Sequence, residues 1–184
     1  FLDSLARHSL IFPNGFATSR KSIHGMPSIL AGIPSFETSY ASSLYSRQKV
    51  GSVVSVAKEL DYQTSFFHGA ANGSMGLLGF SNILGFDKYY GRTEFNNDLE
   101  FDGSWGIWDE PFLGYVKSVL DQQITPFLSS VFTITSHEPY VIPKDYEGKF
   151  DKGHLPIHQC VGYTDHALRK FFEASKTSDW FENT

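Results

Sequence analysis

Apolar residues along this chain repeat with two different spacings. A spacing of three or four positions predicts helices over 2–10, 23–32, 51–60, 74–84, 110–121 and 163–174. Continuous or alternating apolar runs predict extended segments over 11–17, 62–67, 86–90 and 127–135. Helices that alternate with strands are typical of a layered α/β fold, so we expect a mostly parallel sheet with helices on both faces.

The stretches between these elements are rich in Ser, Asn, Gly or Pro and are predicted to be loops, at 34–49, 91–106 and 139–156. Neither an internal repeat nor a linker divides the chain, and 184 residues is an ordinary size for one domain. Asp109 is expected to cap the helix over 110–121, and Asp165 is expected near the start of the helix over 163–174.

Composition excludes several classes of protein. The formal net charge is −5 and no run of Lys or Arg occurs, which argues against nucleic-acid binding because that needs clustered positive charge. The single cysteine, Cys160, excludes an internal disulfide and a cysteine-rich zinc site, so we expect a structural thiol. No run of about 18 apolar residues occurs. The chain starts inside a helical pattern and stops abruptly at Thr184, so we expect an incomplete domain.

Two histidines follow two of the predicted strands. His68 comes directly after the segment 62–67, and His137 follows the segment 127–135. In an open α/β sheet, ligands bind beyond the carboxyl ends of the strands, so these two imidazoles could converge on one substrate. The alternative from the residues alone is that each histidine only ends its strand.

Ser22 lies in a turn rich in hydroxyl groups and cations, just before the predicted helix over 23–32. A serine hydroxyl at such a turn is a candidate nucleophile, with positive charge nearby from Arg20 and Lys21. The simpler alternative is a serine that caps the helix.

Five blocks of sequence, spread over nearly the whole chain, follow one another in a characteristic order. They are Arg20-Lys21-Ser22-Ile23-His24-Gly25 with Ile29-Leu30-Ala31-Gly32-Ile33-Pro34, Phe66-Phe67-His68-Gly69 with Gly85-Phe86-Asp87-Lys88-Tyr89-Tyr90, Trp105-Gly106-Ile107-Trp108-Asp109-Glu110, Ser136-His137-Glu138-Pro139-Tyr140 and Tyr163-Thr164-Asp165. In this order they resemble the extracytoplasmic catalytic domain of lipoteichoic acid synthase-like sulfatase-family proteins, which belong to the alkaline phosphatase superfamily. Residues 1–184 would then form the central fragment of one sulfatase-like catalytic domain.

The resemblance implies a metal-dependent enzyme that transfers or hydrolyses a phosphate or sulfate ester through a covalent serine intermediate. By position, Ser22 would be both the nucleophile and a ligand of the divalent ion, which would be Mn, Mg, Ca or Zn. His68 and His137 would contact the oxygens of the ester, with Arg20 and Trp105 as further substrate-binding residues. The substrate would be an anionic lipid, a glycan or a small ester.

The sequence also departs from the synthases. They have an aspartate, a tryptophan and an arginine where this chain has Ala70, Met75 and Leu77. The substrate of this chain need not be the same as that of the synthases. The other metal ligands of the family are expected outside residues 1–184, so the isolated chain is expected to bind the metal poorly and to be inactive. The resemblance places the full-length protein on the extracytoplasmic face of a bacterial cell membrane, anchored by upstream segments.

Two alternatives remain open at this point. Ser74 lies in Asn72-Gly73-Ser74-Met75-Gly76, which is similar to the turn around the nucleophile of serine hydrolases, but Asn72 stands in place of the first glycine. The second alternative is a non-catalytic domain that binds an anionic glycolipid or glycan through the two histidines, Trp105 and Trp108. The two tryptophans could equally form a packing corner.

Overall fold

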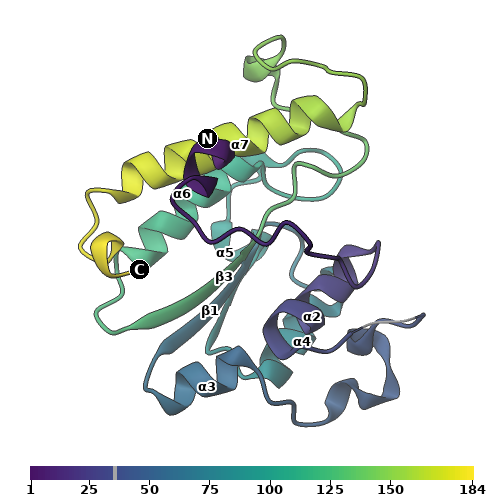
Figure 1. The fold of residues 1–184 in the computed structure, drawn as a ribbon, viewed down its shortest axis with the longest axis vertical. Helices are drawn as coiled ribbons and strands as arrows, with labels where there is room; N and C mark the ends of the chain where they lie inside the picture. Colours follow the sequence, from purple (N-terminus) through teal and green to yellow (C-terminus); the bar gives the residue numbers. More distant parts are fainter. Residues whose placement is uncertain (35–36) are drawn as a thin grey trace.

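Residues 1–34 and 37–184 are described by the computed structural model, and a parallel three-stranded sheet lies at their centre (Figure 1). β1 (Gln63–His68) is the middle strand, between β2 (Lys88–Tyr90) and β3 (Phe127–Phe132). In the register of the sheet, Phe66 lies opposite Tyr89 of β2 and Ser130 of β3. Because the strands are parallel, their carboxyl ends meet at one edge, where ligands of open α/β sheets bind.

Helices cover both faces of the sheet, as the hydrophobic pattern predicts (Figure 1). α2 (Gly25–Ala31), α3 (Val53–Glu59) and α4 (Leu77–Leu84) lie on one face, and α6 (Asp109–Leu120) and α7 (Ile157–Ser175) lie on the other. Successive side chains of a strand point to opposite faces. Phe66 is therefore buried against α2, α3 and α4, whereas Phe67 is buried with residues of α6.

The remaining elements are short. Two are α-helices, α1 (Leu2–Ala6) and α5 (Arg92–Phe95). The others are 3₁₀ turns, η1 (Ser22–His24), η2 (Tyr40–Ser42), η3 (Leu44–Arg47), η4 (Ser74–Gly76), η5 (Asp98–Glu100), η6 (Lys144–Tyr146) and η7 (Phe181–Asn183). Several of these turns lie inside the predicted loops. Within the loop predicted at 34–49, residues 35–36 are outside the described part of the chain.

Two predictions about extended segments are wrong. The segment 11–17 forms no strand, and its apolar side chains are exposed, with Phe16 at 91%. An apolar run without a neighbouring strand to pair with cannot satisfy its backbone by a ladder. β3 ends at Phe132 rather than at residue 135, so His137 lies in the loop after the strand.

Two predictions about helix starts are also wrong. α7 begins at Ile157, directly after Pro156, so Asp165 lies in its middle, where its carboxylate accepts from the backbone N–H of Leu2 at 2.8 Å. Trp108 is the N-cap of α6, and Asp109 is the first residue within the helix. The carboxylate of Asp109 accepts hydrogen bonds from another segment instead of capping its own helix.

Candidate active site

A cavity of about 230 Å³ lies beyond the carboxyl ends of β1 and β3. Several segments that are distant in the sequence contribute to its wall, including the turn before α2. The segment that leads from α1 to this turn crosses this edge of the sheet (Figure 1). The lining residues are Ser22, His68, Ala70, Ser74, Met75, Trp105, Phe132, Thr133, Ile134, Ser136 and His137. The structure thus brings Ser22, His68, Trp105 and His137 around one cavity.

Ser22 is the first residue of η1, and its side chain is exposed. The backbone N–H of His24 donates to the carbonyl of Lys21 at 3.0 Å, which closes the turn and leads directly into α2. Ser74 lines the same cavity from η4, next to Met75, whose φ of 52° is in the left-handed region. The cavity therefore contains both of the serines that the sequence offers as nucleophiles.

His68 is the last residue of β1 and is only 3% exposed. Its Nδ1 lies 3.2 Å from the carbonyl oxygen of Phe132, and its ring stacks on the Phe132 ring with centroids 4.6 Å apart. A carbonyl oxygen can only accept, so Nδ1 carries the proton and Nε2 of the neutral ring carries a lone pair. That Nε2 is buried without a hydrogen-bond partner among the described residues. Burial lowers the pKa of His68, and the Phe132 carbonyl offsets this only in part.

His137 reaches the cavity from the loop after β3, and its side chain is exposed. Its Nδ1 lies 2.9 Å from the carbonyl oxygen of Glu138, so this nitrogen also donates to a carbonyl. The indole of Trp105 packs on the imidazole, with centroids 4.3 Å apart, and its N–H donates to the same carbonyl at 2.5 Å. Trp105 therefore forms a wall of the cavity and holds the loop of His137, and its indole N–H already has a partner.

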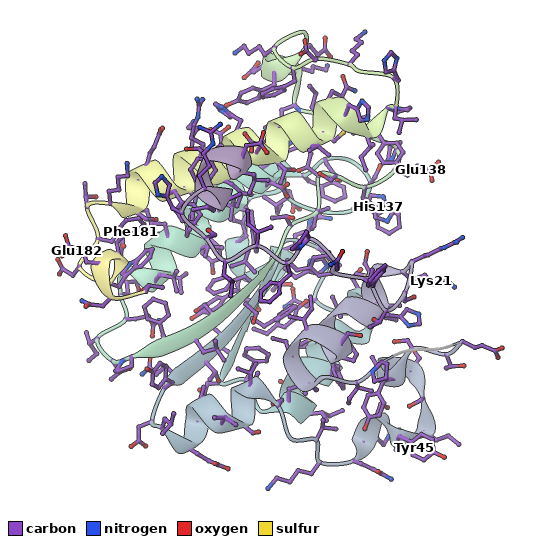
Figure 2. The ribbon with its side chains drawn as sticks, in the orientation of Figure 1. Lys21, Tyr45, His137, Glu138, Phe181 and Glu182 are labelled. Carbon is purple, nitrogen blue, oxygen red and sulfur yellow. The ribbon has the colours of Figure 1, made fainter. Side chains whose placement is uncertain are left out.

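Arg20 is not among the residues that line the cavity, and its side chain is exposed. Lys21 projects outward on the same side of the molecule as His137 (Figure 2), but it lines a separate hollow with His24. Among the described residues, those that line the cavity include no Lys, Arg, Asp or Glu. The structure therefore brings the predicted serine, histidines and tryptophan together, but it leaves the predicted arginine outside.

Sequence reasoning missed several residues of the cavity. Ile134 and Ser136 lie in the segment between β3 and His137, and the only signal for them was their proximity to that histidine. Ala70 and Met75, two of the positions at which the sequence departs from the synthases, line the cavity, whereas Leu77 is fully buried in the core. The departure noted at Leu77 thus falls in the hydrophobic core.

An open parallel sheet with a hydroxyl group and two imidazoles beyond its strand ends is the arrangement of an α/β enzyme that binds a small ligand at this edge. The sulfatase family model matches residues 1–184, and the chain belongs to that family.

The chain is 26% identical over 132 residues to the lipoteichoic acid synthase-like protein YvgJ of Bacillus subtilis, a match that covers 69% of this chain and 21% of that protein. A solved alkaline phosphatase superfamily protein from Vibrio parahaemolyticus is 28% identical with a TM-score of 0.79, over 90% of this chain and 41% of that one. The lipoteichoic acid synthase LtaP of Listeria monocytogenes has the same fold, at 24% identity and a TM-score of 0.77, over 88% of this chain and 42% of that one.

These comparisons confirm the resemblance and the fold inferred from the sequence. At the family level, membership supports transfer or hydrolysis of phosphate or sulfate esters. The chain spans only a fifth to two fifths of the proteins it matches.

The superfamily implies a divalent metal ion, and the described residues can be tested for a site. No group of three or more His, Cys, Asp or Glu side chains suited to a metal ion occurs in 1–34 and 37–184. The cavity offers hydroxyl groups and two imidazoles, without the carboxylates that hard divalent ions prefer. These residues do not by themselves fit a metal centre.

Proposed function

We propose that this chain forms the ester-binding part of the active site in an enzyme that transfers or hydrolyses phosphate or sulfate esters. The observation that supports this most strongly is the gathering of Ser22, His68 and His137 around one cavity at the carboxyl ends of the strands. The cavity of about 230 Å³ suits a small anionic head group, while the rest of a lipid or glycan would stay outside.

Ser22 is the proposed nucleophile. Its oxygen forms a bond to phosphorus or sulfur while the bond to the leaving oxygen breaks, and the hydroxyl proton passes through solvent to the leaving alcohol. Water or an acceptor alcohol then attacks the same atom, which frees the serine and releases the product. The exposure of Ser22 supports this role because the acceptor must reach the covalent intermediate.

The two histidines are proposed to hold the oxygens of the ester. In each ring Nδ1 donates to a backbone carbonyl, so only a protonated ring presents a second N–H, at Nε2, to an anion. For His68 this means that anion binding is coupled to the uptake of a proton from solvent, because burial favours the neutral ring. An anion beside Nε2 would also give a partner to a nitrogen that has none.

A requirement for Mn, Mg, Ca or Zn is proposed only for the full-length protein, with ligands beyond the described residues, and no step above depends on it. Among the described residues no helix is long and apolar enough to cross a membrane. A place on the extracytoplasmic face of the cell membrane and an anionic lipid or glycan substrate are proposed by analogy with the synthase relatives.

The test compares Ser22→Ala with Ser74→Ala in the full-length protein, because both hydroxyl groups line the same cavity. The substrates are aryl phosphodiesters, phosphomonoesters and sulfate esters, assayed with added divalent ions and again after EDTA. We expect Ser22→Ala to lose on the order of 10³-fold or more in kcat and Ser74→Ala to stay within a few-fold. Mass spectrometry should find the transferred group on Ser22 in the parent protein.

Several results would contradict the proposal. Unchanged turnover in Ser22→Ala would remove this serine as nucleophile, and loss only in Ser74→Ala would favour the serine-hydrolase alternative. Full turnover after EDTA would contradict the metal requirement. Failure of every ester to turn over, together with tight binding of a sulfate or phosphate analogue, would favour the non-catalytic binding domain.

A further inference from the structure

Asp109 carries a buried carboxylate that lies outside the lining of the cavity. It is 2% exposed, at the first turn of α6. A buried carboxylate is costly unless hydrogen bonds compensate for its lost hydration. None of the ion pairs formed among the described residues includes Asp109, so its charge is compensated by other groups.

Those groups come from the two segments that α6 faces. Oδ1 accepts from the backbone N–H of Ile134 at 2.7 Å and of Thr135 at 3.1 Å, and Oδ2 accepts from the hydroxyl of Thr164 in α7 at 2.7 Å. In return, the backbone N–H of Asp109 donates to the hydroxyl of Thr135 at 3.1 Å. The hydroxyl of Ser136 lies 3.1 Å from that of Thr164, which extends the network one residue closer to the loop.

This network holds the segment that presents His137. Ile134 and Ser136 line the cavity themselves, and His137 is the next residue. β3 has already ended at Phe132, so no sheet hydrogen bonds fix the backbone of this segment. The carboxylate of Asp109 replaces the missing ladder by accepting two successive backbone N–H groups.

The same stretch of chain is also tied to the other histidine. Two residues before Asp109, the backbone N–H of Ile107 donates to the carbonyl of Gly69 at 3.0 Å. Gly69 directly follows His68. The segment 107–109 therefore contacts the backbone directly after His68 and the backbone shortly before His137.

We propose that Asp109 is a positioning residue that sets His137 opposite His68 across the candidate active site. The carboxylate touches neither substrate nor reacting atoms, and it acts by fixing the segment 134–136. This proposal rests on the proposed function, because a fixed position of His137 matters only if the two imidazole rings hold an anion between them.

The test follows the modification of His137 by diethyl pyrocarbonate in the full-length protein, read by peptide mass spectrometry, with and without inorganic phosphate. The variants are Asp109→Asn and Thr164→Val, with Thr164→Ser as the conservative variant that keeps the hydroxyl. Asp151→Asn removes an exposed carboxylate and is the matched control. His8, which is also exposed, gives the internal reference rate.

We expect phosphate to protect His137 in the parent protein, in Thr164→Ser and in Asp151→Asn. In Asp109→Asn and Thr164→Val the phosphate concentration for half protection should rise on the order of tenfold, while the thermal transition stays cooperative. Protection equal to that of the parent protein in both variants would overturn the positioning role. If Asp109→Asn fails to fold, Thr164→Val carries the same comparison.

The failure of the proposed function gives a different result. If phosphate and sulfate protect His137 in none of the proteins, the anion site is wrong. The rate without phosphate still tests Asp109, because a released loop should react several-fold faster at His137 relative to His8 in Asp109→Asn. An unchanged ratio would overturn the proposal independently.

Discussion

Gly106 lies tightly packed between two parts of the candidate site. A Cβ atom built on it would lie 2.5 Å from the carbonyl oxygen of Gly69 and 2.6 Å from Cδ1 of Ile134. The first contact is with backbone that follows His68, and the second is with a side chain that lines the cavity. We therefore predict that Gly106→Ala displaces the segment around residue 106 from Gly69 and from Ile134.

The size of the effect follows from these contacts. Overpacking a close contact costs about 1–3 kcal/mol. The displacement also weakens the hydrogen bond from the N–H of Ile107 to the Gly69 carbonyl, which is 3.0 Å long and is worth about 1 kcal/mol. Together these contributions lower the free energy of unfolding by about 2 kcal/mol or more. For a domain of this size, that corresponds to a decrease in Tm of roughly 4–8 °C.

The matched control is Gly114→Ala in α6, where an added Cβ meets nothing within 4 Å. Alanine is favoured over glycine within a helix by about 1 kcal/mol, so this variant should be as stable as the parent protein or more stable. The assay is thermal unfolding by circular dichroism, with sulfate affinity measured by calorimetry. Equal stability of the Gly106 and Gly114 variants would contradict this prediction. Unchanged sulfate affinity in Gly106→Ala would show that this contact does not shape the cavity.

Two further predictions concern pH. Because burial lowers the pKa of His68 below its ordinary value of about 6.5, an anion that binds to the protonated ring must take up a proton. Sulfate affinity should therefore rise by up to tenfold per pH unit as the pH falls toward the lowered pKa of His68 and level off below that pKa, and the slope should decrease in His68→Gln. An equal slope in calorimetric titrations of that variant would contradict this. Burial raises the pKa of Asp87, but hydrogen bonds from Lys58 and Thr64 outweigh it and hold the pKa below its usual value. Asp87→Asn should lower the free energy of unfolding by about 1 kcal/mol at pH 7, a small effect because Asp87 is 38% exposed and screened by solvent. The difference in stability between this variant and the parent protein should disappear as the pH falls through the lowered pKa of Asp87.

The sequence predicts the fold well because a parallel strand that is buried on both faces is a continuous apolar run. Phe66 and Phe67 are neighbours in an apolar run, and each is buried under a different layer of helices. The same logic fails over 11–17, where apolar residues lie exposed in a segment that crosses the sheet edge. Apolar content alone cannot distinguish a strand from a segment without a pairing partner.

The position of His68 in the site was predictable, because the end of a central parallel strand always faces the ligand edge. The position of His137 was predicted for a partly wrong reason, since it is placed by a loop rather than by a strand end. The hydrogen bonds that fix this loop come from Asp109 and Thr164, on other elements. A local pattern shows an acid at a helix start but cannot show which remote backbone it binds, so Asp109 was assigned to its own helix.

The charges around the cavity determine how an anion can be held. Among the described residues, the only titratable side chains that line it are those of His68 and His137. Both rings commit Nδ1 to backbone carbonyls, which fixes the tautomer and leaves Nε2 as the variable site. A fixed lysine or arginine would hold an anion at every pH, whereas two imidazoles do so only when protonated. Among the described residues that line the cavity, anion binding and proton uptake are therefore coupled.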